Sequence, residues 1–168
     1  MAGGLDDMRD LYATGLRNAH AVESQALEII DRQIGLHDDF PEFREMLRLH
    51  LDETRQQKTR LEGLLARLNE SPSAFKDMAL SFMGNLTAMM NAPADDAILK
   101  NLFSDTAFEA FEVATYRSLI VMAEQIGETD AVGVLQQSLR EEEAMQRWLL
   151  EHNEEITRRF MADHARAA

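Results

Sequence analysis

The chain of 168 residues contains no cysteine, which excludes disulfide bonds, thiolate metal sites and thiol chemistry. This absence fits a reducing cytoplasm, where we expect the protein to reside. No apolar stretch approaches the roughly 20 residues that cross a bilayer, so we expect no membrane partner. The N-terminal sequence has no basic region followed by an apolar run, and we therefore expect no signal peptide.

Basic residues are scarce. Lysine and arginine total 17 against 30 aspartates and glutamates, and the formal net charge is -13. Such a surface repels phosphate backbones, so nucleic acid is not an expected partner. An acidic surface also attracts cations, although simple solubility explains the charge equally well.

Helix-breaking residues are few, with 3 prolines and 8 glycines in the chain. The main interruptions, in order, are Gly35, Pro41, Pro72, Pro93 and Gly127. The stretches between them are rich in alanine, leucine, glutamate, glutamine and arginine, which favour helix. No run alternates between apolar and polar residues for long enough to indicate a sheet.

The spacing of apolar residues predicts four long helices, at about residues 5–34, 41–68, 93–126 and 131–161. A shorter helix, at about 73–90, carries an apolar stripe of phenylalanine, methionine and leucine that indicates packing or a dimer interface. Short turns make each pair of long helices antiparallel, and one long connection joins the pairs. This pattern predicts an all-α, ferritin-like antiparallel four-helix bundle with a long crossover containing a short fifth helix. We expect one domain over residues 1–168, frayed at about 1–4 and 162–168.

The apolar stripe of each long helix is interrupted near its middle by a glutamate. These four residues are Glu23, Glu53, Glu112 and Glu142. A buried carboxylate without a partner is costly, and four at one level of a bundle also repel one another. Two divalent cations would offset both penalties, and iron or manganese suits carboxylate and imidazole ligands. The four glutamates are therefore our candidate metal ligands.

Three further residues are candidates of second rank, namely Glu109, Gln57 and Gln146. Glu53 lies 30 residues after Glu23, and Glu142 lies 30 residues after Glu112, so the two helix pairs resemble repeats around one site. Glu141 is the alternative inward residue if the helical phase shifts by one.

The histidines are interpreted as structural residues. His20 and His50 lie on or beside the apolar stripes, where a histidine is more often a hydrogen-bonded core residue than a ligand. His37 and His152 are expected at the surface.

Four short stretches, considered together, resemble those of the DUF892 family, the YciF- and YciE-like ferritin-like proteins of bacteria. They are Leu16–Gln25 (LRNAHAVESQ), His50–Thr54 (HLDET, followed by Gln57 and Arg60), Glu109–Glu112 (EAFE, followed by Tyr116) and Leu139–Glu142 (LREE). The resemblance extends over about residues 5–155. It implies a ferritin-like fold, homodimers, a rubrerythrin-like di-iron site and a link to bacterial stress responses. It also implies that the four stripe glutamates are the family's helix carboxylates.

The chain departs from the family pattern at several positions. Ala110 stands where relatives usually carry histidine, Phe111 where they carry tyrosine, and Gln146 where aspartate is common. No Glu-x-x-His of the ferritin type exists, since Gln56 and Met145 occupy the third positions. The resulting site is rich in oxygen ligands and poor in imidazole. We expect iron, with manganese or another divalent metal as alternatives. A redox-active site would oxidise Fe(II) with oxygen or peroxide, but the sequence does not establish turnover.

A rival hypothesis is a structural or partner-binding bundle whose carboxylate layer is vestigial and free of metal. The metal content of the protein distinguishes this hypothesis from the metal-binding one. A third interpretation, a metal-free enzyme with a carboxylate acid–base pair, needs a second functional group that the sequence does not supply, and no catalytic residue is identified.

Overall fold

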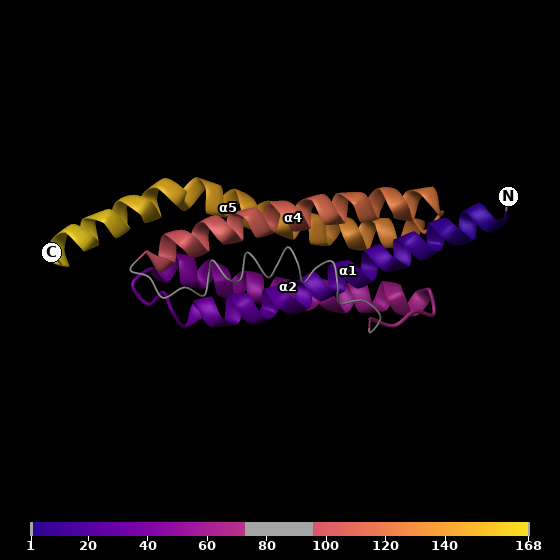
Figure 1. Cartoon of the computed structure of the whole chain (residues 1–168), viewed down its shortest axis with the longest axis horizontal. Coiled ribbons are helices and arrows are strands. Elements are labelled where there is room, and N and C mark those ends of the chain that lie inside the picture. The colour runs from indigo at the N-terminus through magenta and orange to yellow at the C-terminus, as the bar shows by residue number, and fades with distance from the viewer. Residues whose placement is uncertain (1, 73–95, 168) are drawn as a thin grey trace.

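The computed structural model describes residues 2–72 and 96–167, which form four long helices and no strand (Figure 1). The helices are α1 (Ala2–Ile34), α2 (Pro41–Arg67), α4 (Ala97–Gln125) and α5 (Thr129–Ala167). The predicted all-α bundle is confirmed. The short helix expected at about 73–90 lies outside the described residues.

Local sequence explains the turns. Pro41 is the first residue of α2, where its missing N–H leaves no helical hydrogen bond unmade. Gly127 ends α4 with a φ of 78°, a left-handed conformation that glycine adopts without strain. The Glu128 N–H then donates to the Ala123 carbonyl at 2.9 Å, which satisfies an otherwise free carbonyl of the last turn.

The outer ends of the bundle differ from expectation. Helix α1 begins at Ala2, and α5 continues beyond Met161 to Ala167. Both ends project past the bundle, at opposite ends of the molecule (Figure 1). Residues 161–166 are exposed, and a local ion pair between Arg166 and Asp163, at 2.6 Å, adds to the helix propensity of the alanines there.

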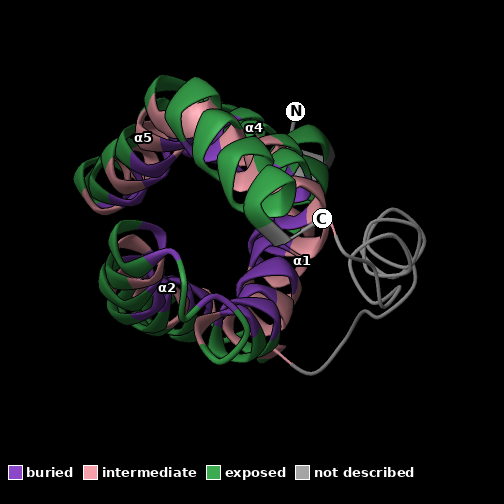
Figure 2. Ribbon diagram, turned by 90° about the vertical axis from the view of Figure 1, so that its left-hand side faces the viewer, coloured by how far each residue is buried: buried purple, intermediate pink, exposed green. Residues whose placement is uncertain are grey.

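Each helix packs against two others. Helices α1 and α2 form one pair, α4 and α5 form the second, and the pairs meet through α1 with α4 and α2 with α5. Buried residues line the shared interior, as a view along the bundle shows (Figure 2). The arrangement brings one face of every helix to a common core.

The core consists of two apolar clusters. One lies toward the turn between α1 and α2, and its most buried members include Phe43, Leu47, Leu102, Met145 and Leu149. The other lies toward the opposite turns and includes Leu16, Leu61, Leu65, Leu119 and Leu135. A layer of polar side chains separates the clusters, as the interrupted stripes predict.

Two adjacent leucines of α5 test this assignment of the core. Leu149 is fully buried, whereas Leu150 is 59% exposed. We expect Leu149→Ala to lower the free energy of unfolding by about 2–5 kcal/mol, because it removes buried methyl groups and leaves a cavity. Leu150→Ala should change it by no more than about 0.5 kcal/mol. Urea unfolding of both variants measures the difference, and equal losses would contradict the assigned helix phase.

Candidate metal centre

The polar layer contains four buried carboxylates. Glu23, Glu109, Glu112 and Glu142 are each at most 3% exposed. They come from three helices, with Glu23 on α1, Glu142 on α5 and the other two on α4. Glu109 and Glu112 are three residues apart, so both face the interior from one side of α4.

His50 of α2 lies among these carboxylates. Its Nε2 is 3.3 Å from Glu109 Oε1 and 3.6 Å from Glu142 Oε2. Together with Glu112, these residues each offer a ligand atom, and the four atoms all lie within 4.8 Å of one another. This is the spacing at which a single ion could contact nitrogen and oxygen donors from three helices.

Glu53 lies at the edge of the layer. Its side chain is 26% exposed, and its Oε2 is 3.3 Å from His50 Nδ1. Thr54 takes the inward position on this turn of α2, where its hydroxyl donates to the His50 carbonyl at 2.9 Å. Glu53 therefore contacts the outer nitrogen of His50 and orients the ring, as carboxylates beside metal-binding histidines do.

Glu23 has a partner for one oxygen only. The Tyr116 hydroxyl donates a hydrogen bond to Glu23 Oε1. Burial raises the pKa of Glu23 to about 8, although the Tyr116 hydrogen bond and the charge of His50 act in the opposite direction. Burial and the Glu23 carboxylate likewise raise the pKa of Tyr116 well above its ordinary value.

The other acidic groups are perturbed in the same way. Burial, followed by the charge of Glu142, raises the pKa of Glu112 well above its ordinary value. Burial, followed by the charge of Glu109, raises the pKa of Glu142. For His50, burial lowers the pKa, but the surrounding carboxylates outweigh it and raise the pKa well above its ordinary value. Buried carboxyls with raised pKa values that lie close together are typical of functional sites.

The hydrogen bonds of the layer also indicate a site that binds a cation. Seven buried side-chain oxygens in the layer have no hydrogen-bond partner. They are Glu23 Oε2, Gln57 Oε1, Glu109 Oε2 and both oxygens of Glu112 and Glu142. Buried polar atoms are rarely left unpaired, and these are six carboxyl oxygens and one neutral amide oxygen, all of them acceptors. The donor set fits a hard or borderline divalent cation.

The structure brings together most of the residues predicted from sequence. Glu23, Gln57, Glu109, Glu112 and Glu142 all lie in the buried layer. Glu53 is at its edge, as described, and Gln146 is half-buried because Met145 takes the inward position on α5. Of the adjacent pair on α5, Glu142 is the inward residue, whereas Glu141 lies at the seam between α2 and α5 and pairs with Arg60.

One expectation for the histidines is confirmed and one is wrong. His50 is a core residue as expected, but its contacts with three carboxylates also make it a candidate ligand. The sequence signal for this role was the position of His50 on the apolar stripe of α2, one turn before Glu53. His37, expected at the surface, is only 5% exposed, so that expectation is wrong. Its Nε2 lies 2.8 Å from Asn101 Nδ2 on α4, a contact that no local pattern reveals.

Asp105 is a buried acid that the sequence reasoning missed. It lies one turn before Glu109 on α4 and is 7% exposed. Gln33 Nε2 donates to its Oδ1 at 2.8 Å, and burial raises its pKa to about 8. Its position four residues before Glu109 was a usable signal.

Comparison with known proteins places the chain among others of the same fold. Residues 7–162 match the DUF892 family, described as a domain of unknown function. A solved structure from Xanthomonas campestris pv. campestris has a TM-score of 0.80 at 28% identity, covering 95% of this chain and 99% of that chain. YcfI from Rhodopseudomonas palustris has a TM-score of 0.73 at 28% identity, covering 84% and 92%. The E. coli stress protein YciF has a TM-score of 0.73 at 21% identity, covering 87% and 94%.

None of the four described helices combines the length and apolar character needed to cross a bilayer.

The raised pKa values predict how pH changes the stability of the metal-free protein. Above the ordinary pKa of glutamate, the unfolded chain has lost protons that folded Glu23, with its pKa of about 8, still holds. Glu112, Glu142 and His50 act with the same sign. The folded state therefore binds more protons, and stability falls as pH rises through this range. With chelator present, we expect a loss of at least about 1 kcal/mol between roughly pH 6.5 and pH 8.5.

Urea unfolding at the two pH values measures this loss. Glu23→Gln should reduce the dependence on pH, because the amide cannot titrate. Glu143→Gln is the matched control, since Glu143 lies outside the layer and pairs with Arg117 at 2.6 Å. Stability that is flat or rising over this range would show that the carboxyls are ionised in the metal-free protein.

Proposed function

The chain belongs to the DUF892 family, and on that basis we propose that it is a single-domain, ferritin-like protein whose buried carboxylate layer binds two divalent metal ions. The observation that carries the proposal is the set of seven unpartnered oxygens between the two apolar clusters. None of them has a hydrogen-bond partner in the described chain, and the nearest cationic group to Glu142 is His50, whose Nε2 lies 3.6 Å from Glu142 Oε2. Neutral packing at the same positions would cost far less.

Charge supports two ions rather than one. When ionised, the four buried glutamates of the layer carry four negative charges in a region that excludes water. Two divalent cations supply the same number of positive charges and leave the layer neutral, with His50 as a neutral ligand. One divalent ion would leave two buried negative charges without compensation.

The residues fall into two overlapping groups. His50, Glu109, Glu112 and Glu142 form the group whose ligand atoms lie close together. Glu23 and Gln57 offer further oxygens in the same layer. The charge of Glu23 acts on both Glu112 and Glu142, so these two glutamates would be shared between the groups. Glu53 and Gln146 at the edge are outer candidates.

Iron is the first candidate metal, and manganese is the second, because the donors are carboxylate and amide oxygens with a single imidazole and no sulfur. If iron is bound, the chemistry that it would supply is the oxidation of Fe(II) to Fe(III) by oxygen or peroxide. The chain's own contribution is to bind and orient the ions, to exclude water with the apolar clusters, and to hold a proton between Tyr116 and Glu23.

The biological setting is proposed by analogy. One structural relative is described as a stress protein, and we extend a stress-related role to this chain as part of the proposal. The family resemblance suggests a homodimer, and the absence of cysteine is consistent with a cytoplasmic location.

Metal stoichiometry tests the proposal directly. Protein expressed with added iron and purified without chelator should contain about two metal ions per chain by elemental analysis, the number that two-metal carboxylate sites hold. Glu112→Gln and Glu142→Gln should each lower binding, because an amide supplies one weaker oxygen in place of a charged carboxylate. Glu143→Gln, the same change one residue along α5, should leave binding unchanged.

Retention of two ions by the double variant Glu112→Gln/Glu142→Gln would exclude the assigned site. A wild-type chain that stays empty during anaerobic Fe(II) titration would instead favour the rival structural bundle.

Stability should change in the opposite direction from binding when a ligand is replaced by an apolar residue. Glu112 has two buried oxygens without a partner. Glu112→Leu should therefore raise the free energy of unfolding of the metal-free protein by about 1–4 kcal/mol while it lowers metal binding. Thermal unfolding in chelator measures the first effect. A loss of stability would mean that Glu112 has favourable contacts without metal.

A further inference from the structure

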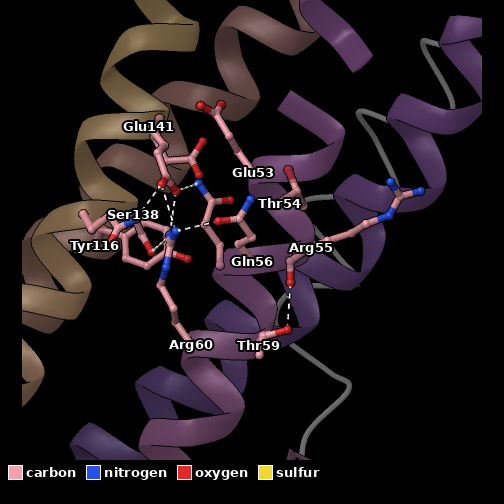
Figure 3. A network of polar contacts seen from close by, with 12 residues as sticks. Glu53, Thr54, Arg55, Gln56, Thr59, Arg60, Tyr116, Ser138 and Glu141 are labelled. Carbon is pink, nitrogen blue, oxygen red and sulfur yellow. Dashed lines mark hydrogen bonds and ion pairs between the residues drawn. The ribbon is translucent and has the colours of Figure 1, made fainter. Parts of the chain in front are cut away.

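Three polar side chains form a connected series at the seam between α2 and α5. Arg60 of α2 donates to both oxygens of Glu141 on α5, at 2.6 Å and 2.9 Å. Glu141 Oε2 also accepts a hydrogen bond from Gln57 Nε2 at 3.0 Å. Figure 3 shows Arg60 directed at Glu141, with Ser138 beside the pair as a further acceptor for the guanidinium at 3.1 Å.

This series fixes which way the Gln57 amide points. A carboxylate accepts hydrogen bonds and cannot donate them, so Gln57 must turn its amino group toward Glu141. Its carbonyl oxygen is then directed to the opposite side of the amide. That side is the interior, because Gln57 is fully buried and Glu141 lies at the partly exposed seam. The oxygen has no hydrogen-bond partner there.

The orientation that Glu141 imposes on the Gln57 amide is unfavourable when the layer of acidic side chains contains no metal. Gln57 lies on the same face of α2 as His50, two turns further on, and so faces the interior of the bundle. His50 contacts Glu109, and α2 and α4 both run from the first apolar cluster to the second. Gln57 and Tyr116, each seven residues further along its helix, therefore lie at one level of the bundle. Because Tyr116 donates to Glu23, this level is the Glu23 side of the layer. Beside carboxylates an amide would gain by presenting its amino group, which could donate to them. Presenting the oxygen instead is favourable when the group that faces it is a cation.

We propose that Arg60 is a positioning residue that acts through Glu141 to present the Gln57 carbonyl oxygen as a neutral ligand on the Glu23 side of the metal centre. The inference rests on the proposed metal-binding function and adds a specific device to it. A neutral oxygen at this position completes coordination without adding a fifth buried negative charge to a layer that two divalent ions already neutralise.

The simpler explanation is that Arg60 and Glu141 only hold α2 against α5. Two other ion pairs already join these helices, Arg67 with Asp130 at 3.2 Å and Arg159 with Glu42 at 3.3 Å. The experiment must therefore separate the orientation of Gln57 from the attachment of the helices.

Glu141→Gln makes this separation. The substitution keeps the shape of the side chain but puts an amide opposite Gln57, so either end of Gln57 can then face the seam. We expect one of the two Mn²⁺ ions in a calorimetric titration of the full chain to bind about 10–100-fold more weakly, the loss typical of residues that orient metal ligands. Arg60→Met should have a similar effect. Glu143→Gln and Arg67→Met are the matched controls and should bind Mn²⁺ as the wild type does.

A second substitution provides the rescue. In the Glu141→Gln background, Gln57→Glu should restore most of the lost affinity, because a carboxylate offers oxygen at both ends and needs no orientation. Its charge replaces the one removed from Glu141 beside Arg60, so the total charge of the region is unchanged. Thermal unfolding in chelator establishes that each variant is folded, and the Mn²⁺ electron paramagnetic resonance spectrum reports the changed ligand set independently of any activity.

The outcomes are distinct. Weaker binding in Glu141→Gln that the double variant reverses supports the positioning role. Unchanged binding in Glu141→Gln, or weakened binding that Gln57→Glu does not restore, overturns it while the metal site itself stands. A wild-type chain that binds no Mn²⁺ overturns the proposed function, and this inference falls with it.

Discussion

The structure depends on one constraint, the burial of four carboxylates at a single level of a helical bundle. Each carboxylate loses its hydration, and each raises the cost of ionising its neighbours. The consequences are visible in the raised pKa values of Glu23, Glu112 and Glu142 and in the oxygens that no hydrogen bond reaches. The two apolar clusters on either side supply the favourable burial that keeps the chain folded around this unfavourable layer.

Around the layer, polar side chains control how the acidic groups are presented. Tyr116 holds one oxygen of Glu23, Glu53 contacts the outer nitrogen of His50, and the Arg60–Glu141 pair holds the amide of Gln57. Each outer contact leaves a donor atom directed into the layer. Metal sites in proteins are usually built in this way, with outer side chains that orient the inner, ligand-bearing side chains before the ion binds.

The helical period was enough to predict the bundle and most of the layer, because a glutamate within an apolar stripe is a local signal. It did not resolve neighbours that share nearly the same direction. Thr54 faces inward beside Glu53, and Met145 beside Gln146, because a rotation of the helix by part of a residue decides between them. The burial of His37 was beyond local pattern, since its partner Asn101 is 64 residues away along the chain. The role of Arg60 required the position of Glu141 on another helix.

The division of the ligands between the two helix pairs has a consequence for how the protein is made. The first pair contributes Glu23, His50 and Gln57, and the second contributes Glu109, Glu112 and Glu142. The first pair is synthesised before the second, and it carries only one of the four buried glutamates. The polar layer is completed only when the two halves dock. On the proposed function, metal binding therefore requires a chain whose two halves have both been synthesised and folded.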